Sequence, residues 1–229
     1  PEQAVRDVLA SAFDSAGQRC SAARLLFVQE DVADRVITML KGAMAELKIG
    51  DPMDYATDIG PVIDDDARQM LEAHKARMAA EARTILDMAL PADCAKGTFV
   101  SPAAYEISSV SSLTREVFGP VLHVVRFGGD RLADVCAALN GTGYGLTLGL
   151  HTRIERTAAE VRRLMRVGNI YVNRNQIGAV VGAQPFGGEG LSGTGPKAGG
   201  PHYLHRFATE RVCSTDTTAS GGNAALMSM

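Results

Sequence analysis

Apolar positions at helical intervals predict three helices in the first part of the chain. Between residues 2 and 15 the apolar side chains fall on one face, and Gly17 follows as a helix stop. The stretch from Asp31 to Gly50 repeats this pattern. Residues 64–83 are more polar, with acidic side chains at the beginning and basic ones towards the end, as the helix dipole favours.

Short apolar runs alternate with helical segments along the rest of the chain. The predicted strands cover residues 23–28, 84–87, 98–101, 121–127, 146–150 and 169–173, and two further helices cover 130–139 and 153–165. Alternation of this kind is typical of α/β domains. We therefore predict an α/β fold with a mostly parallel, twisted sheet and helices on both of its faces.

Two later segments lack a hydrophobic period. Residues 173–201 form a long loop candidate, and a loop of this length in a compact domain is usually functional. Residues 213–229 are polar and glycine-rich, which predicts an extended C-terminal tail after a main domain of residues 1–212. Because sites in open α/β sheets gather in the loops beyond the strand ends, residues 173–201 are one place to look for chemistry.

Composition and charge narrow the possible partners. The chain has 229 residues, of which 46% are hydrophobic and 21% charged, and its net charge is −3. No concentrated basic face is expected, which argues against nucleic acid as a partner of this segment. No apolar run approaches the roughly 18 residues of a membrane span, so no membrane contact is expected from it either. Acidic residues follow Pro1 where a signal peptide would be basic, and we expect a piece of a longer protein.

The cysteine pattern favours a reducing compartment. The chain has four widely spaced cysteines and no C-x-x-C pair, which is typical of neither a zinc site nor a disulfide framework. His202 and His205 are three residues apart, as some helical metal ligands are, but no Cys or carboxylate lies close enough in sequence to complete a site. We therefore expect a cytoplasmic protein segment without a metal.

Cys20, in "GQRCSAAR", has two interpretations. Free cysteines are among the most buried residues, so packing in the core is the default. The preceding helix end, the Gly17 break and the polar pair Gln18–Arg19 instead place Cys20 in a turn, where Arg19 could favour the thiolate. The other cysteines offer less, and Cys136 falls within a helical pattern.

The segment "TREVFGPVL" is the second feature, because Gly119–Pro120 leaves Glu116 and Phe118 in a turn before a strand. Glu116 could accept hydrogen bonds from ribose hydroxyls, and Phe118 could pack against a flat ring. The plainer alternative is a solvated Glu and a core Phe. A third feature, "GGEGLSGTGPKAGG", is neither a P-loop nor a dinucleotide fingerprint, and its glycines more plausibly let the backbone approach a small ligand.

"GQRCSA", "REVFGPVL" and "PFGGEGLSGTG" occur in this order, and together they resemble the catalytic half of the aldehyde dehydrogenase superfamily. The match covers about residues 1–212. The stretch "NQIGAVVGAQPFGGEGLSGTGPKAGGPHYL" resembles the L-glutamate γ-semialdehyde (pyrroline-5-carboxylate) dehydrogenases, especially the dehydrogenase modules of bacterial bifunctional proline utilization proteins. The closing "TTASGGNA" resembles the tail of those proteins.

The resemblance implies a role for each motif. Cys20 is the nucleophile that attacks the aldehyde, gives up a hydride to NAD and forms a thioester, which water hydrolyses to glutamate. Glu116 holds the nicotinamide ribose and Phe118 flanks the nicotinamide. The substrate-binding residues of the resemblance are Ser21, Gly178, Ala179 and Phe186. The first three anchor the α-carboxylate through a hydroxyl and backbone N–H groups, and Phe186 lines the tunnel.

The resemblance also implies parts that this chain lacks. A cofactor-binding domain, a general-base Glu and an oxyanion-binding Asn are expected upstream of Pro1, so the isolated chain is expected to be inactive. Assembly into a homo-oligomer through the C-terminal tail is implied too, and a peripheral contact of the parent protein with the inner membrane is left open. Two alternatives remain: a dehydrogenase for another carboxylated semialdehyde such as succinate semialdehyde, and a non-catalytic assembly module with an inert Cys20.

Overall fold

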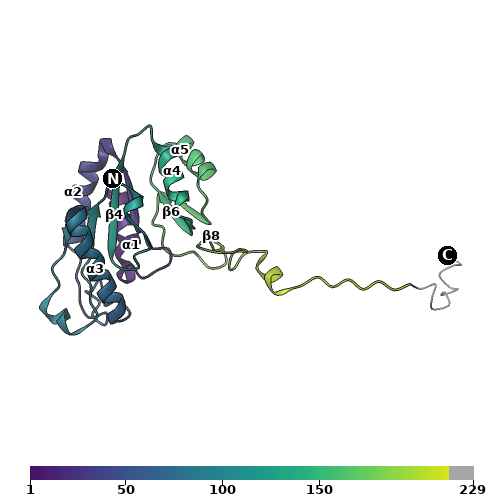
Figure 1. Ribbon diagram of the computed structural model, residues 1–229, viewed down its shortest axis with the longest axis horizontal. Coiled ribbons are helices and arrows are strands. Elements are labelled where there is room, and N and C mark those ends of the chain that lie inside the picture. The colour runs from purple at the N-terminus through teal and green to yellow at the C-terminus, as the bar shows by residue number, and fades with distance from the viewer. Residues whose placement is uncertain (217–229) are drawn as a thin grey trace.

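A four-stranded sheet organises the first lobe of the molecule, residues 1–127, in the computed structural model, which describes residues 1–216. The strand order is β1-β4-β3-β2, with β1 parallel to β4, β4 parallel to β3, and β2 antiparallel at the edge. The strands are β1 (Leu25–Gln29), β2 (Arg83–Asp87), β3 (Ala103–Glu106) and β4 (Val121–Phe127). Strand β4, labelled in Figure 1, therefore has a parallel neighbour on each side.

Both faces of this sheet are covered. Every side chain from Val121 to Val125 is buried, and successive side chains of a strand point to opposite faces. The helices that supply the cover are α1 (Glu2–Phe13), α2 (Glu30–Ala45) and α3 (Asp65–Glu81). The buried apolar core joins them to the sheet, with Phe13, Leu40, Met44, Leu71 and Tyr105 among its largest fully buried side chains.

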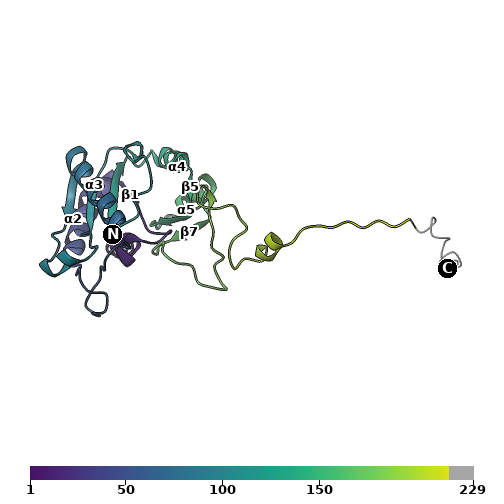
Figure 2. The same ribbon diagram turned by 60° about the horizontal axis from the view of Figure 1, so that its bottom comes forward.

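The second lobe, residues 132–172, is smaller and lies beside the first (Figures 1 and 2). Its elements are α4 (Leu132–Gly141), β5 (Tyr144–Gly145), β6 (Thr147–Leu150), α5 (Glu155–Leu164) and β7 (Asn169–Val172). Strands β6 and β7 pair in parallel, and β5 pairs antiparallel with β8 (Glu189–Gly190) from the following loop. The loop from residue 173 to 201, called the anchor loop below, thus returns to the second lobe.

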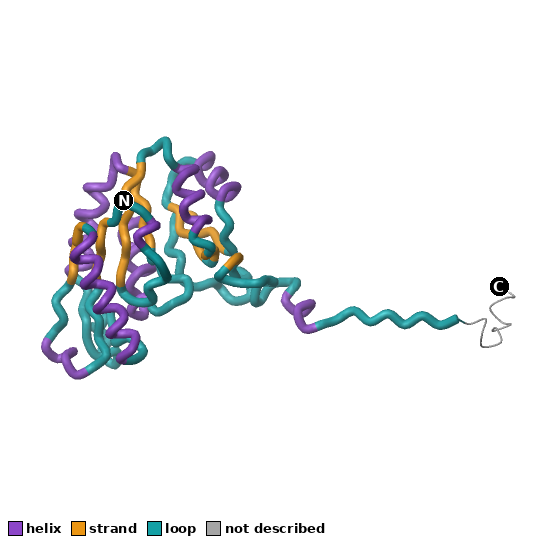
Figure 3. The backbone as a smooth tube through the Cα atoms, in the orientation of Figure 1, coloured by secondary structure: helices purple, strands orange, loops and turns teal. Residues whose placement is uncertain are grey.

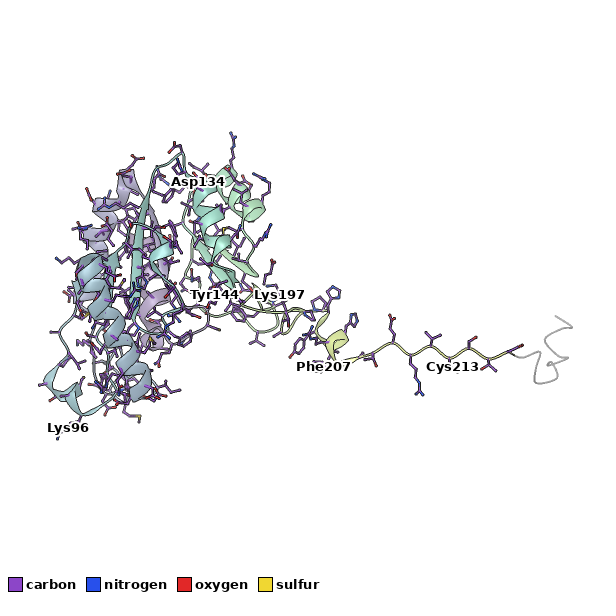
Figure 4. All side chains as sticks on the ribbon, in the orientation of Figure 1. Lys96, Asp134, Tyr144, Lys197, Phe207 and Cys213 are labelled. Atoms are coloured by element: carbon purple, nitrogen blue, oxygen red, sulfur yellow. The ribbon has the colours of Figure 1, made fainter. Side chains whose placement is uncertain are left out.

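An exposed arm follows the anchor loop and leads away from both lobes (Figures 3 and 4). It begins with η4 (Tyr203–Phe207) and continues without regular structure to residue 216. The other 3-10 turns are η1 (Asp14–Gly17), η2 (Ala92–Lys96) and η3 (Val110–Ser112). Most of the predicted tail, residues 217–229, lies outside the described residues. Within residues 1–216 no helix is both long and apolar enough to cross a membrane.

The predicted fold class is confirmed, with its parallel-dominated sheet. The predicted strand at 98–101 is wrong, because β3 begins only at Ala103, after Pro102. Thr98 instead exchanges two hydrogen bonds with Val62, accepting from the Val62 N–H and donating its hydroxyl to the Val62 carbonyl. The two-residue strands β5 and β8 were not predicted, since so short a ladder carries no periodic signal.

Candidate active site

A sharp turn after α1 brings Cys20 to the surface. Ser15, Ala16 and Gly17 have φ values of 56°, 53° and 65°. Left-handed backbone costs a non-glycine residue about 1 kcal/mol or more, so the surrounding structure must hold this turn in place. Cys20 follows it on the exposed side of the segment that we call the nucleophile loop, residues 17–22. Cys20 is therefore a surface thiol, and the core-packing alternative is wrong.

Close backbone packing joins the nucleophile loop to the segment at 114–120, which we call the ribose turn. A Cβ atom at Gly17 would overlap the carbonyl oxygen of Gly119. Gly119 in turn sits directly on the side chain of Leu71, which leaves no room for a Cβ there. These two glycines allow the nucleophile loop, the ribose turn and α3 to stack without side chains between them.

Gln18 fixes the nucleophile loop on its other side. Its Nε2 donates to the carbonyl oxygen of Pro61 at 3.3 Å, and its Oε1 accepts from the Ile63 N–H at 2.8 Å. One amide side chain therefore satisfies both a donor and an acceptor of the 61–63 segment, as a strand partner would. This contact holds the chain just before Cys20.

Glu116 and Phe118 lie at the surface of the ribose turn, with the Glu116 side chain 35% exposed and Phe118 39% exposed. Phe118 is not a core residue. Both contact Arg24: its Nε donates to Glu116 Oε1 at 3.2 Å, and its guanidinium carbon lies 4.5 Å from the centroid of the Phe118 ring. The second Glu116 oxygen makes no hydrogen bond within residues 1–216.

Ser21 and Gly178, which are far apart in the sequence, meet at the site. The Gly178 N–H donates to Ser21 Oγ at 3.3 Å, and Ser21 is buried. Gly178 has a φ of 69°, which favours glycine. Neither the hydroxyl hydrogen of Ser21 nor the N–H of Ala179 finds an acceptor in the described part of the chain. Two free donors therefore lie on neighbouring groups, beside the nucleophile.

Gln176 holds this contact in place and was missed from the sequence. Its Nε2 donates to the Ser21 carbonyl at 3.2 Å, its Oε1 accepts from the Gly149 N–H at 3.0 Å, and its own N–H donates to Ser11 Oγ at 3.1 Å. One residue thus joins α1, the nucleophile loop and β6. Its place in "NQIG", directly before the predicted anchor, was the only available signal.

The rest of the anchor loop is held by a lysine. Phe186 is half-buried, and its backbone pairs with Ala198 through two hydrogen bonds of 3.0 and 2.9 Å. Lys197 Nζ donates to the carbonyls of Gly168 and Gly187 and to Asn169 Oδ1. All three ammonium hydrogens are used, and burial lowers the pKa of Lys197. Figure 4 shows Lys197 where the second lobe meets the arm.

No hydrogen bond joins Phe186 to Cys20 or Ser21 in the described part of the chain.

A buried histidine pair lies beneath the site. His123 Nδ1 lies 3.0 Å from the Arg24 carbonyl oxygen, and His123 Nε2 lies 2.8 Å from His74 Nε2. Since the carbonyl can only accept, Nδ1 carries the His123 proton and His74 donates to His123. Burial lowers the pKa of each ring to about 4, so both are neutral at pH 7.

The remaining cysteines and histidines form no comparable cluster. Cys94 and Cys136 are buried, and burial raises the pKa of both thiols, whereas Cys213 lies exposed on the arm. The rings of His202 and His205 lie 5.8 Å apart between centroids. Within residues 1–216 no group of three or more His, Cys, Asp or Glu side chains is placed to hold a metal ion.

Comparison with known proteins places these features in one family. The sequence model of the aldehyde dehydrogenase family matches residues 1–212. The bifunctional protein PutA of Klebsiella aerogenes is 56% identical over 215 residues, which is 92% of this chain and 16% of that protein. The 1-pyrroline-5-carboxylate dehydrogenase of Geobacillus kaustophilus is 38% identical over 206 residues, 89% of this chain and 39% of that enzyme.

Solved structures agree with these relatives. A crystal structure of a mutant of Bradyrhizobium japonicum proline utilization A superposes with a TM-score of 0.88 at 61% identity, covering 92% of this chain and 21% of the other. A mutant of the Thermus thermophilus 1-pyrroline-5-carboxylate dehydrogenase superposes with a TM-score of 0.82 at 32% identity, covering 90% of this chain and 39% of the other. The chain thus spans about a sixth of the bifunctional relatives and well under half of the dehydrogenases.

Proposed function

The chain belongs to the aldehyde dehydrogenase family, and we propose that it forms the catalytic half of an NAD-dependent L-glutamate γ-semialdehyde dehydrogenase in proline catabolism. The relatives that support this substrate are named for PutA and for 1-pyrroline-5-carboxylate dehydrogenase. In this proposal Cys20 is the nucleophile, Glu116 and Phe118 contact the cofactor, and Ser21, Gly178, Ala179 and Phe186 bind the substrate.

One observation carries the proposal: three segments far apart in sequence converge around an exposed thiol. Gly17 packs on Gly119, and Ser21 accepts a hydrogen bond from Gly178. The nucleophile loop therefore touches both the ribose turn and the anchor loop. A purely structural module would not need a surface cysteine at this junction, so the convergence favours chemistry over the assembly alternative.

The first step is attack by the Cys20 thiolate on the aldehyde carbon, which forms a C–S bond and an oxyanion. The backbone N–H of Cys20 makes no hydrogen bond within the described residues, so it is free to donate to that oxygen. Nicotinamide, when bound, supplies the two-electron oxidant that accepts the hydride from this carbon. The carbon is thereby oxidised, and the acyl group stays on Cys20 as a thioester.

Hydrolysis completes the reaction. Water adds to the thioester carbon and loses a proton, the C–S bond breaks, and the carboxylic acid leaves while the Cys20 thiolate is restored. We assign the base that removes the water proton, and a second oxyanion donor, to the part of the protein beyond this chain. The coverage of the relatives, with this chain spanning 16% of the PutA length, supports a partner domain of the same protein.

The residues on this chain fit a nicotinamide nucleotide. Family dehydrogenases of this kind generally use NAD or NADP, and we propose NAD. The unpartnered Glu116 oxygen can accept from ribose hydroxyls, and a carboxylate is a good acceptor for them. One face of the Phe118 ring is covered by Arg24, which leaves the remaining exposed ring surface for a flat heterocycle.

The substrate carboxylate is proposed to bind at Ser21, Gly178 and Ala179. The Ser21 O–H and the Ala179 N–H are unpaired donors, and a buried carboxylate needs several donors once its water is removed. If the carboxylate also accepts a hydrogen bond from the Gly178 N–H, it would replace Ser21 Oγ as the acceptor of that N–H. Phe186 would then pack along the aliphatic part of the substrate.

Two further parts of the proposal concern the surroundings. We propose that the arm contributes to a homo-oligomer, since Phe207 and Val212 are exposed apolar side chains on it.

The four free cysteines fit a reducing cytoplasm. No nucleic acid or membrane contact is proposed for this segment, and a peripheral membrane contact of the whole protein would have to come from its other parts.

Paired substrates test the function in the full-length protein. L-glutamate γ-semialdehyde should be oxidised with a kcat/KM well above those of succinate semialdehyde and propanal. Ala179→Leu, which crowds the carboxylate donors, should lower kcat/KM for glutamate semialdehyde about a hundredfold and for propanal only severalfold, because propanal has no carboxylate. A preference for succinate semialdehyde would reassign the substrate, and absence of all three activities would overturn the enzyme assignment.

A further inference from the structure

We propose that Arg24 is a positioning residue that holds the nucleophile loop and the ribose turn in one fixed arrangement and keeps a positive charge beside the reactive sulfur. The inference rests on the proposed function and deepens it. Arg24 is the last residue before β1, two positions beyond the "GQRCSA" motif, and it is the only described residue that hydrogen-bonds both the nucleophile loop and Glu116.

The guanidinium of Arg24 bridges two segments about a hundred residues apart. On the nucleophile loop, Nη1 donates to the Gly17 carbonyl and Nη2 donates to the Arg19 carbonyl at 3.1 Å. On the ribose turn, Nη1 also approaches the Gly119 carbonyl at 3.4 Å and Nε donates to Glu116 Oε1 at 3.2 Å. A planar fork with several donors can span these acceptors together, whereas the ammonium of a lysine cannot.

Both residues proposed to touch the cofactor depend on this side chain. The ion pair fixes one oxygen of Glu116 and leaves the other for a ligand. The guanidinium carbon lies over the Phe118 ring, 4.5 Å from its centroid, and limits the positions of that ring. Because the Arg24 side chain is only 13% exposed, little competing water reaches these contacts.

The backbone of Arg24 is itself fixed to the core. Its carbonyl oxygen accepts from the N–H of His123 and from His123 Nδ1, each at 3.0 Å. His123 is fully buried and contacts His74 of α3. The side chain therefore extends from a rigid point, and its contacts set the distance between the two loops.

Charge gives Arg24 a second effect. Burial lowers the pKa of the guanidinium, while the negative charges of Glu116 and of the Cys20 thiolate oppose that shift. Arg24 Nη2 donates to the carbonyl of Arg19, the residue before Cys20, so the cation lies near the sulfur and attracts negative charge there. Arg19, the neighbour considered from the sequence, is instead exposed and donates its Nε to Ser15 Oγ.

Two substitutions separate geometry from charge in the full-length protein. Arg24→Lys keeps the charge and loses the fork, and Arg24→Met loses both. NAD+ affinity is measured by calorimetry, and the pH dependence of Cys20 alkylation by iodoacetamide is followed by peptide mass spectrometry. Arg126→Lys is the matched control, because Arg126 also bridges two segments, through ion pairs with Asp34 and Glu106, but touches neither loop.

The expected results differ for each variant. Arg24→Lys should weaken NAD+ binding about tenfold and leave the apparent pKa of Cys20 alkylation close to that of the wild type. Arg24→Met should weaken NAD+ binding as much and also raise that apparent pKa by about one unit. Arg126→Lys should change neither quantity by more than about twofold or a few tenths of a unit.

Unchanged NAD+ affinity and an unchanged alkylation profile in Arg24→Lys and Arg24→Met would overturn the inference, even if both variants melt at lower temperature, because that pattern indicates a structural role alone. If Arg24→Met does not fold, NAD+ binding by Arg24→Lys decides. If the wild type oxidises no semialdehyde, the proposed function fails, while the alkylation profile of Cys20 still tests the role of Arg24.

Discussion

The first lobe and the anchor loop hold their shape by different means. In the first lobe, buried apolar side chains on both faces of β4 contact α1, α2 and α3. In the anchor loop, residues 173–201, the contacts are backbone approaches at glycines, a few side-chain hydrogen bonds and the partly buried ammonium of Lys197. The nucleophile therefore rests on a packed core, and the substrate contacts rest on polar groups that substitution can remove one at a time.

Because of this difference, substitutions in the two regions should affect different properties of the protein. Damage to the first lobe should lower the stability of the whole domain together with its activity, because core contacts are shared among many side chains. Damage to the anchor loop should change substrate recognition and leave stability nearly intact. Substitutions in the two regions should therefore separate stability from substrate recognition.

Gly17→Ala should have the largest effect on stability. The new Cβ would overlap the Gly119 carbonyl, and the φ of 65° disfavours alanine, so we expect a loss of about 4 kcal/mol and loss of turnover. Gly42→Ala in α2 is the control, because nothing lies within 4 Å of its Cβ position and alanine favours helices. Urea unfolding compares the two, and equal stability of both variants would contradict the close packing of the loops.

Leu71→Ala should cost about 3 kcal/mol of unfolding free energy. Leu71 is fully buried in the core and packs directly under Gly119, so its loss leaves a cavity beneath the ribose turn. Leu204→Ala on the exposed arm is the matched control, with an expected change below about 0.5 kcal/mol. A similar loss for both leucines would show that the core is not where the stability resides.

Acid should weaken the first lobe through the His74–His123 pair. Their pKa of about 4 in the folded state lies below the 6.5 of the unfolded chain, so between these values the unfolded state binds more protons. Stability should therefore fall as the pH drops from 6.5 towards 4, by on the order of 2 kcal/mol from this pair. His123→Gln should flatten that dependence and the exposed His205→Gln should not; unchanged slopes for both would rule out the pair as the cause.

Lys197→Met should have the smallest effect on stability and a selective effect on activity. The variant removes three donors to Gly168, Asn169 and Gly187, which loosens the anchor loop but not the core. We expect kcat/KM for glutamate semialdehyde to fall about tenfold, or 1.4 kcal/mol, with a change of less than about 1 kcal/mol in unfolding. The exposed Lys96→Met is the control. A large loss of stability without a change in kcat/KM would show that the anchor loop contributes to stability and not to substrate recognition, contrary to this prediction.

The same contrast explains what could be predicted from the sequence. The helices and strands of the first lobe carry clear periods, so α1, α3 and β4 were found nearly at their observed bounds. The predicted run from Asp31 to Gly50 is too long, because α2 ends at Ala45. The anchor loop has no period, and the pairing of β5 with β8 depends on contacts that no local pattern records. The conformation of short loops around glycines is determined by the residues that pack against them in the folded protein.

The candidate site divides in a similar way. Cys20, Glu116 and Phe118 stand in motifs that a reader of the sequence can single out, and the structure places them at one surface. Arg24 and Gln176 lie in or beside such stretches, but their roles come from partners as distant as Glu116 and Gly149. A polar side chain that joins separate loops leaves no pattern in its own neighbourhood.

The assignment of Cys20 as the nucleophile is tested by looking for the acyl group on its sulfur. The full-length protein is mixed with NAD+ and glutamate semialdehyde, quenched with acid within milliseconds, digested and examined by mass spectrometry. We predict a thioester adduct of the glutamyl group on Cys20 that is absent without NAD+ and absent from Cys20→Ser. Turnover with the acyl group on the exposed Cys213, or on no cysteine at all, would contradict the assignment of Cys20 as the nucleophile.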